Sequence, residues 1–205
     1  MTIVLGVLRP SFVVLAADSR RAIGVSANGV FRAEGFNDAE RKLAVHPTAP
    51  FAIALAGTAL GVLSLGEELD HLLHGTDEPS VNALRLKLER EVLHDTAVAI
   101  ASVGADGVAK LARIKLQPPR APDVTERSPV VFPPSAELRE FYEGTAWDRG
   151  DTPDEVAEAL REAIVAGIRE EQRLVPDPMK RVCGGTPSAV IVDCNGARFV
   201  ASTEG

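Results

Sequence analysis

The sequence contains little cysteine, no excess of positive charge and no apolar run long enough to cross a membrane. Its two cysteines, Cys183 and Cys194, are too few for a disulfide framework and lack the spacing of a zinc site. The 22 Lys and Arg against 29 Asp and Glu give a net charge of −7, which argues against a nucleic-acid partner because phosphate binding needs a basic surface. The longest apolar stretch, residues 51–66, is interrupted by glycine, serine and threonine and is shorter than the roughly 20 residues of a membrane span.

The opening residues also lack a secretory signal, because no basic segment followed by a long apolar segment is present. We therefore expect a cytoplasmic protein. The chain does have ordinary globular composition, with 205 residues, 45% of them hydrophobic and 25% charged. At this length a folded chain buries roughly 70% of the surface of its unfolded form, so a core without disulfides is feasible. We expect one domain over residues 1–205.

Short apolar, β-branched runs between turn residues predict strands. The chain opens with two such runs, residues 2–8 and 12–17, in which both faces are apolar, as in a sheet covered on both sides. Residues 19–41 are polar and are expected to form a long excursion with weak strand content. Residues 117–134 hold six of the 14 prolines and are expected to form a loop. Further strands are expected at residues 42–45, 51–56, 96–103, 108–116, 188–193 and 197–202.

Two regions show the spacing of amphipathic helices. Leucines recur at three- and four-residue steps over 65–75, and the pattern repeats over 81–94. A third helix begins at Thr152-Pro153, with Glu155 at the capping-box position, and buries Val156, Leu160, Ile164 and Ile168 on one face. Runs of strands separated by runs of helices predict an α+β fold with helices stacked on sheet faces.

The second residue is the first candidate nucleophile. Thr2 is small enough to favour removal of Met1, which would leave a hydroxyl and a free α-amine on one residue. Such an amine has an ordinary pKa of about 7.7–8.0, so it can act as the general base for its own hydroxyl.

Asp18 and Lys42 are the charged residues that this nucleophile would need. Asp18 ends the second strand, and in a hairpin that end returns beside the start of the first strand, near Thr2. Lys42 precedes another apolar run. A buried lysine near Thr2 would favour loss of the amine and hydroxyl protons, and Asp18 would keep that lysine charged and oriented.

With these residues in place, the chain resembles a known family. The segments T-I-V-L-G-V at 2–7, V-V-L-A-A-D-S-R at 13–20, Lys42-Leu43 and Ala56-Gly57-Thr58-Ala59 are similar to the β-subunits of the 20S proteasome and to the HslV and Anbu peptidases. These are N-terminal nucleophile (Ntn) hydrolases. The resemblance implies a four-layer αββα sandwich that assembles into a ring and cleaves peptide bonds without a metal or other cofactor.

The resemblance also implies roles for individual residues. Thr2 would be the nucleophile, Lys42 would lower the local proton affinity, Asp18 would position Lys42, and the Gly57 N–H would donate to the oxyanion. Ala22 and Leu55 would line the pocket for the residue before the scissile bond. Arg20 is expected to support the structure through ion pairing.

The sequence departs from the family at two supporting positions. Where the family has Gly-Ser-Gly, this chain has Phe132-Pro133-Pro134-Ser135, so either Ser135 substitutes with a one-residue shift or Pro134 occupies the position. Near the C-terminus, Cys183-Gly184-Gly185-Thr186 replaces an Asp and a Ser. Thr186 could supply the hydroxyl, but Cys183 cannot supply the carboxylate, and Asp177 is the alternative carboxylate on this loop.

We therefore expect a proteasome-like threonine peptidase that acts on polypeptides inside a self-compartmentalising homo-oligomeric ring, with an ATPase unfoldase as a possible partner. Two alternatives stay open: a catalytically inactive ring subunit with a structural role, and an Ntn amidase that acts on a small substrate. The four histidines are scattered and indicate no metal site.

Overall fold

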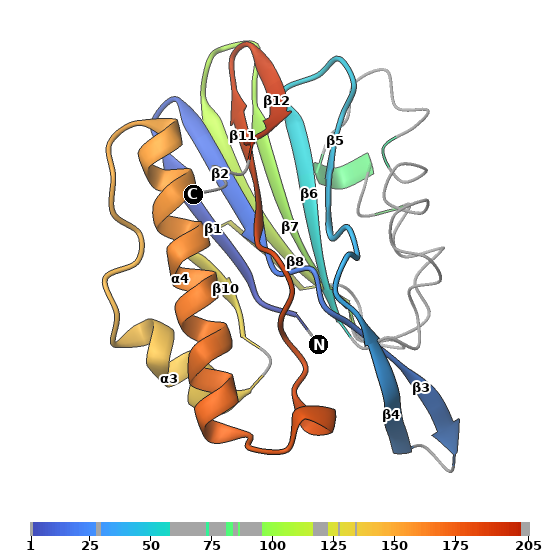
Figure 1. Cartoon of the computed structure of the whole chain (residues 1–205). Coiled ribbons are helices and arrows are strands. Elements are labelled where there is room, and N and C mark those ends of the chain that lie inside the picture. Colours follow the sequence, from blue (N-terminus) through green and yellow to red (C-terminus); the bar gives the residue numbers. More distant parts are fainter. Residues whose placement is uncertain are drawn as a thin grey trace.

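A computed structural model describes residues 2–27, 30–57, 73, 81–83, 86, 96–116, 123–126, 128–133 and 135–201. Among these residues the protein has a mixed α+β structure with two five-stranded antiparallel sheets and a separate two-stranded hairpin (Figure 1). The expected α+β class is therefore confirmed.

The first sheet is built around the N-terminal hairpin. It has the order β10-β1-β2-β11-β12. The bounds of its strands are β1 (Val4–Arg9), β2 (Phe12–Ala17), β10 (Val130–Phe132), β11 (Ser188–Asp193) and β12 (Gly196–Phe199). β1 and β2 pair with Val4 opposite Ala17, as the short turn between the two apolar runs predicts. The C-terminal strand β11 lies on the other side of β2.

The second sheet has the order β5-β6-β7-β8-β9. Its strands are β5 (Leu43–Val45), β6 (Phe51–Gly57), β7 (Thr96–Val103), β8 (Ala109–Leu116) and β9 (Asp123–Glu126). The first four strands lie within one or two residues of the predicted ranges, because each is an apolar run between clear turn residues.

A buried cluster fills the space between the two sheets. It combines Val13 and Leu15 of β2 with small side chains of β6 and β7, namely Ala52, Ala54, Ala56, Ala99 and Ala101. Alternate residues of β2, including Val14 and Ala16, belong to a second cluster on the opposite face of the first sheet. Both faces of β2 are therefore buried, as its unbroken apolar sequence predicts.

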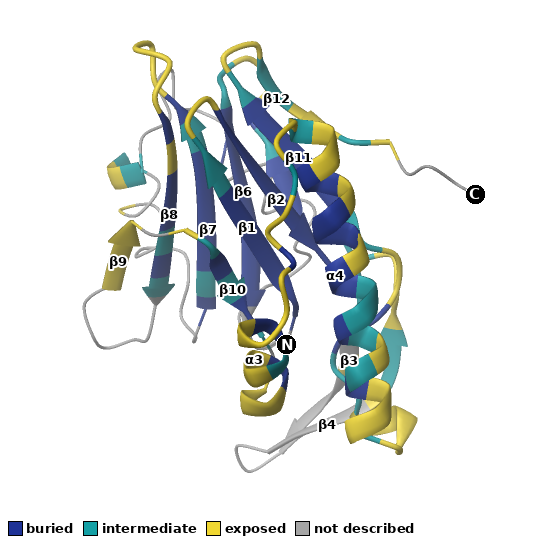
Figure 2. Cartoon of the chain, turned by 90° about the vertical axis from the view of Figure 1, so that its left-hand side faces the viewer, coloured by how far each residue is buried: buried dark blue, intermediate teal, exposed yellow. Residues whose placement is uncertain are grey.

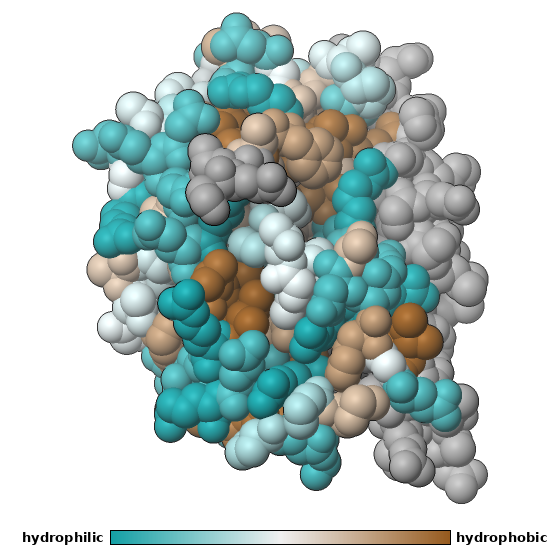
Figure 3. All heavy atoms as spheres, viewed as in Figure 1, coloured by the Kyte–Doolittle hydropathy of each residue, from teal (hydrophilic) through white to brown (hydrophobic). Residues whose placement is uncertain are grey.

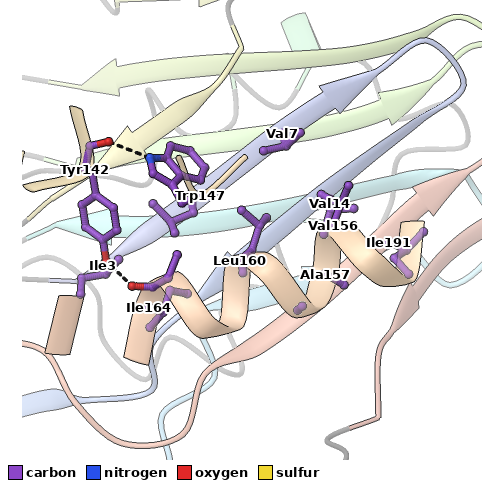
Figure 4. Close-up of a cluster of buried hydrophobic side chains, with 14 of the residues drawn as sticks. Ile3, Val7, Val14, Tyr142, Trp147, Val156, Ala157, Leu160, Ile164 and Ile191 are labelled. Atoms are coloured by element: carbon purple, nitrogen blue, oxygen red, sulfur yellow. Dashed lines mark hydrogen bonds between the residues drawn. The ribbon is translucent and has the colours of Figure 1, made fainter. Parts of the chain in front are cut away.

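Helices cover the outer face of the first sheet. α4 (Pro153–Leu174) packs there against β1, β2 and β11, and α3 (Ala136–Glu143) packs against α4 and β10. Val156 of α4 lies beside Val14, and Ile164 lies near Ile3 (Figure 4). Only one side of α4 is buried (Figure 2). A short 3-10 helix, η1 (Pro178–Lys180), follows.

The outer face of the second sheet carries a third buried cluster. Leu73 joins Phe51, Ile53, Val98 and Ile100 in it. The two helices expected over 65–75 and 81–94 lie mostly outside the described residues, but the described positions 73, 81–83 and 86 are helical.

The prediction of weak strand content over residues 19–41 is wrong, and the loop prediction over 117–134 is wrong for the strands described there. Residues 19–41, expected to have weak strand content, form the hairpin of β3 (Arg21–Ala27) and β4 (Val30–Asn37). The region 117–134, expected to be a loop, contains β9 and β10. The physical reason is that these strands are edge or hairpin strands, which need little apolar patterning and tolerate neighbouring prolines. β9, for example, is exposed along its whole length (Figure 2).

Within the described ranges, no helix has both the length and the apolar character that crossing a membrane requires. Polar side chains cover most of the α4 side of the face shown in Figure 3.

Candidate active site

The centre of the candidate site is a buried ion pair between Asp18 and Lys42. Lys42 Nζ lies 2.9 Å from Asp18 Oδ1, and each residue is only 1% exposed. Asp18 directly follows β2, and Lys42 directly precedes β5, so the ends of strands from different sheets bring the charges together. The sequence-based expectation that these two residues meet is confirmed.

Two backbone groups complete the surroundings of the Asp18 carboxylate. The Ile3 N–H donates to Oδ1 at 2.9 Å, and the Gly184 N–H donates to Oδ2 at 3.0 Å. Burial raises the pKa of Asp18 and lowers the pKa of Lys42, because it disfavours both charges. The ion pair opposes both shifts, and the two N–H groups hold the carboxylate in a fixed orientation.

Thr2 adjoins this pair through the backbone, because it directly precedes Ile3. Thr2 is buried, with 7% exposure. The pairing of Val4 with Ala17 continues past the strand ends, because the Asp18 N–H donates to the Ile3 carbonyl at 3.2 Å. Ile3 thus contacts Asp18 through both its N–H and its carbonyl, and Thr2 is the residue that directly precedes Ile3.

Gly57 and Leu55 lie on β6, next to the segment that carries Lys42. The Leu55 N–H donates to the Lys42 carbonyl at 3.0 Å. Alternate N–H groups of a strand point to the same edge, so the Gly57 N–H also points to the edge where Lys42 lies. The Leu55 side chain is 3% exposed and packs in the outer cluster of the second sheet. Ala22 lies in β3 opposite Phe36, and its side chain falls outside the described part of the structure.

Ser135 and Thr186 have other described roles. The Ser135 hydroxyl caps α3 by accepting from the Leu138 N–H at 3.2 Å. Thr186 is exposed, and its backbone N–H donates to Ser19 Oγ at 2.9 Å. Among the described contacts, neither hydroxyl is joined to Asp18 or Lys42. Pro134, the alternative to Ser135, lies outside the described residues.

The loop after η1 is hydrogen-bonded to the segment that follows Asp18. The Gly184 carbonyl accepts from the N–H groups of Ser19 and Arg20 at 3.2 and 3.1 Å. Arg20 also makes a two-point ion pair with Asp38, at 2.6 and 2.7 Å. The expectation that Arg20 forms a supporting ion pair is confirmed. A Cβ on Gly184 would lie 2.5 Å from Arg20 Cζ, so a larger residue there would displace the Arg20 guanidinium from its present position.

The carboxylate that faces Cys183 comes from α4. Glu171 is 4% exposed and accepts from the Cys183 thiol at 2.7 Å. The suggestion that Asp177 reaches inward is wrong, because its side chain caps η1 by accepting from the Met179 N–H at 3.0 Å. Sequence reasoning missed Glu171, although it lies three residues after Ile168 and so continues the predicted buried face of the helix.

The arrangement combines a buried cation, an orienting carboxylate and a neighbouring threonine, which is suited to activating a hydroxyl or amine. In the described ranges no group of three or more His, Cys, Asp or Glu side chains is placed to hold a metal ion. A scan against known protein families finds no match to this sequence, and a search of curated proteins also finds none.

Proposed function

We propose that the chain is a proteasome-like threonine peptidase of the Ntn-hydrolase type, with Thr2 as nucleophile after removal of Met1. The observation that carries the proposal is the buried Asp18–Lys42 ion pair, whose carboxylate accepts from the N–H of Ile3, the residue that follows Thr2. Burying a charged pair is costly, and such pairs with shifted pKa values concentrate at functional sites. The proposal includes the four-layer αββα arrangement, which two packed sheets with α4 outside one and Leu73 outside the other support.

In the proposed reaction the Thr2 hydroxyl attacks the carbonyl carbon of the scissile amide and transfers its proton to the Thr2 α-amine. The positive charge of Lys42 keeps the α-amine unprotonated before the reaction and favours loss of the hydroxyl proton, and Asp18 holds Lys42 in place. The Gly57 N–H donates to the oxyanion, an interaction worth about 3–4 kcal/mol in similar sites. The amine then gives the proton to the leaving nitrogen, and an ester to Thr2 remains. Water hydrolyses this ester with the same amine as base.

The proposed substrates are polypeptides, which would enter a chamber formed by a homo-oligomeric ring in the cytoplasm, delivered by an ATPase unfoldase. Leu55 and Ala22 are assigned to the substrate pocket by the resemblance alone. The buried position of Leu55 means that a pocket would have to open beside it for direct substrate contact.

A second candidate is a catalytically inactive subunit of such a ring. It is favoured by the occupation of Ser135 in the cap of α3 and by Cys183 at a position where the resemblance expects a carboxylate. An Ntn amidase for a small substrate uses the same residues and differs in having an open site in a monomer or dimer.

The test is covalent labelling of the purified full chain with a peptide epoxyketone, followed by intact-mass and peptide mapping. We expect a mass that lacks one methionine and a single adduct on Thr2. Ser135→Ala should still label, whereas Thr2→Ala should not. Retained Met1 in fully assembled protein, or absence of an adduct on a free Thr2, would contradict the peptidase and favour the inactive subunit.

A further inference from the structure

Among the residues whose burial is described, Glu171, near the end of α4, is the most deeply buried acidic group outside the Asp18–Lys42 pair. Its two carboxylate oxygens accept three hydrogen bonds from one short stretch of chain. Oε1 accepts from the Val182 N–H at 2.9 Å, and Oε2 accepts from the Cys183 N–H at 3.0 Å and the Cys183 thiol at 2.7 Å. A carboxylate with three donors on a helix fixes this stretch against α4.

The next peptide group of the same stretch belongs to the candidate active site. The Gly184 N–H donates to Asp18 Oδ2 at 3.0 Å. Three consecutive N–H groups, those of residues 182, 183 and 184, are therefore held by two buried carboxylates, Glu171 and Asp18. Because peptide units are planar, only the φ and ψ angles of Cys183 lie between the peptide held by Glu171 and the peptide held by Asp18.

We infer that Glu171 is a positioning residue for the Asp18–Lys42 pair, which it serves by holding Val182 and Cys183 so that the Gly184 N–H stays on Asp18. The kinetic consequence of this role rests on the proposed function, whereas the structural consequence does not. Loss of the Glu171 carboxylate releases the loop, removes a donor from Asp18 Oδ2 and lets the carboxylate that orients Lys42 rotate.

The chemistry of Cys183 fits this role. Burial and the hydrogen bond to Glu171 raise the pKa of its thiol above the ordinary value, and the nearby Asp18 acts in the same direction while Lys42 opposes it. The thiol therefore stays protonated and remains a donor to Glu171 at neutral pH. A neutral donor, the Cys183 thiol, thus stands where the resemblance expects a carboxylate.

Close contacts at Gly184 and Gly185 restrict the position of the loop. Gly185 has φ of +71°, which side chains rarely adopt, and a Cβ there would meet Ser19 Oγ and lie 2.6 Å from the Asp38 carbonyl. A Cβ on Gly184 would meet the guanidinium end of Arg20, which would then have to move. These contacts restrict the loop on the Ser19 and Arg20 side, and Glu171 holds it on the α4 side.

The test compares Glu171→Gln with Glu170→Gln by hydrogen exchange of the full chain. Glu170 is the neighbouring residue on α4, and its described hydrogen bonds go to the exposed Arg173 rather than to the loop, so it is a matched control for loss of one charge. In Glu171→Gln we expect exchange at Gly184 to be faster by about tenfold or more, because a hydrogen bond to a carboxylate is lost. Amides of β11 should exchange as in the control.

Unchanged exchange at Gly184, or an increase matched by the amides of Val190 and Ile191, would overturn the inference, because the second result means only lower global stability. The thiol is tested separately. Cys183→Ser keeps a donor and should retain protection at Gly184, whereas Cys183→Ala should lose part of it.

The kinetic arm uses peptide hydrolysis. Glu171→Gln should lower kcat roughly tenfold to a hundredfold with little change in KM, because displacement of an orienting group affects the reaction more than binding. If no variant and not even the unaltered chain hydrolyses peptides, the proposed function fails, and exchange at Gly184 still decides the role of Glu171. If the unaltered chain is active and Glu171→Gln is equally active, the inference fails alone.

Discussion

At the scale of single residues, the fold buries a lysine and an aspartate that could easily have remained at the surface. Lys42 is among the largest fully buried side chains, and its ammonium is compensated by one carboxylate at 2.9 Å. Replacing a buried pair with apolar groups is often neutral or stabilising, so such a pair is weak support for a purely stabilising role. The proposed function assigns the pair a second role, the activation of Thr2.

Lys42→Met should therefore destabilise the protein strongly. The substitution keeps the volume but leaves the Asp18 carboxylate buried without a cation, which costs about 3–5 kcal/mol. The measurement is the free energy of unfolding in guanidinium chloride. Asp18→Asn in the same chain should make the double variant more stable than the sum of the two single changes predicts, since the uncompensated charge is gone.

The exposed pair of Arg173 and Glu170 provides the control, because Arg173→Met should cost only about 0–1 kcal/mol. A Lys42→Met variant as mildly affected as Arg173→Met would show that the pair is open to water, and the account of the site as a desolvated ion pair would then be wrong.

Part of this site was predictable from the residue types in the sequence, and another part was not. Asp18 and Lys42 were predictable because each is a charged residue at the border of an apolar run. The Ile3 and Gly184 N–H groups were not, because every residue carries such a donor and only the tertiary structure selects which ones meet Asp18. Glu171 lies between these cases, since its place on the buried face of a helix was visible but its partners were not.

At the scale of elements, α4 is the part of the structure that the sequence predicted best. Thr152 Oγ1 accepts from the Glu155 N–H at 3.3 Å, and Glu155 accepts from the Thr152 N–H at 3.0 Å, which completes the predicted capping box. Caps and helical spacing are local signals, so they can be recognised in the sequence without knowledge of the rest of the fold. The β3–β4 hairpin has no comparable local signal, because its glycines and polar residues also fit a loop.

Thr152→Ala should lower the free energy of unfolding by about 0.5–2 kcal/mol, because the side-chain acceptor for the Glu155 N–H is lost. Thr152→Ser keeps the hydroxyl and should stay close to the unaltered protein. Both are measured by urea unfolding at pH 7. Equal stability of the alanine and serine variants would mean that the hydroxyl does not stabilise the start of α4.

The same cap should weaken in acid. The N–H groups of Thr152 and Asp151 lower the pKa of Glu155 below its ordinary value. A lowered folded-state pKa contributes stability above the unfolded-state pKa of about 4.3, and this contribution is lost as the pH falls through the lowered value. Glu155→Gln should therefore destabilise the protein at pH 7 and have less effect in acid.

At the scale of the whole molecule, small residues set how closely the layers approach. The inner face of β6 and β7 is lined by alanines. A Cβ on Gly6 would lie 3.0 Å from Leu15 and 3.4 Å from Leu111 of the facing sheet. Hydrophobic spacing predicted buried strands and covering helices, but the pairing of β2 with β11 joins opposite ends of the chain and is specified by no local pattern. The sandwich arrangement came from the resemblance alone.

Gly167 shows how the helical layer is coupled to the site. It lies on the buried face of α4, and a Cβ there would collide with the Tyr142 hydroxyl, lie 2.8 Å from Tyr142 Cζ and come within 3.3 Å of Ile3 Cδ1. The Tyr142 hydroxyl donates to the Ala163 carbonyl at 3.1 Å, so it cannot move away without breaking a buried hydrogen bond. Ile3 in turn donates to Asp18.

Gly167→Ala should therefore destabilise the protein by about 1–3 kcal/mol through overpacking, although alanine in an exposed helix stabilises by about 1 kcal/mol relative to glycine. The measurement is guanidinium unfolding of Gly167→Ala, Tyr142→Phe and the double variant. Because Tyr142→Phe removes the hydroxyl but leaves Cζ, the double variant should regain only part of the loss. A stabilising Gly167→Ala would mean that α3 and α4 have room to separate and that the packing of the helical layer does not constrain Ile3 and the residues beside it.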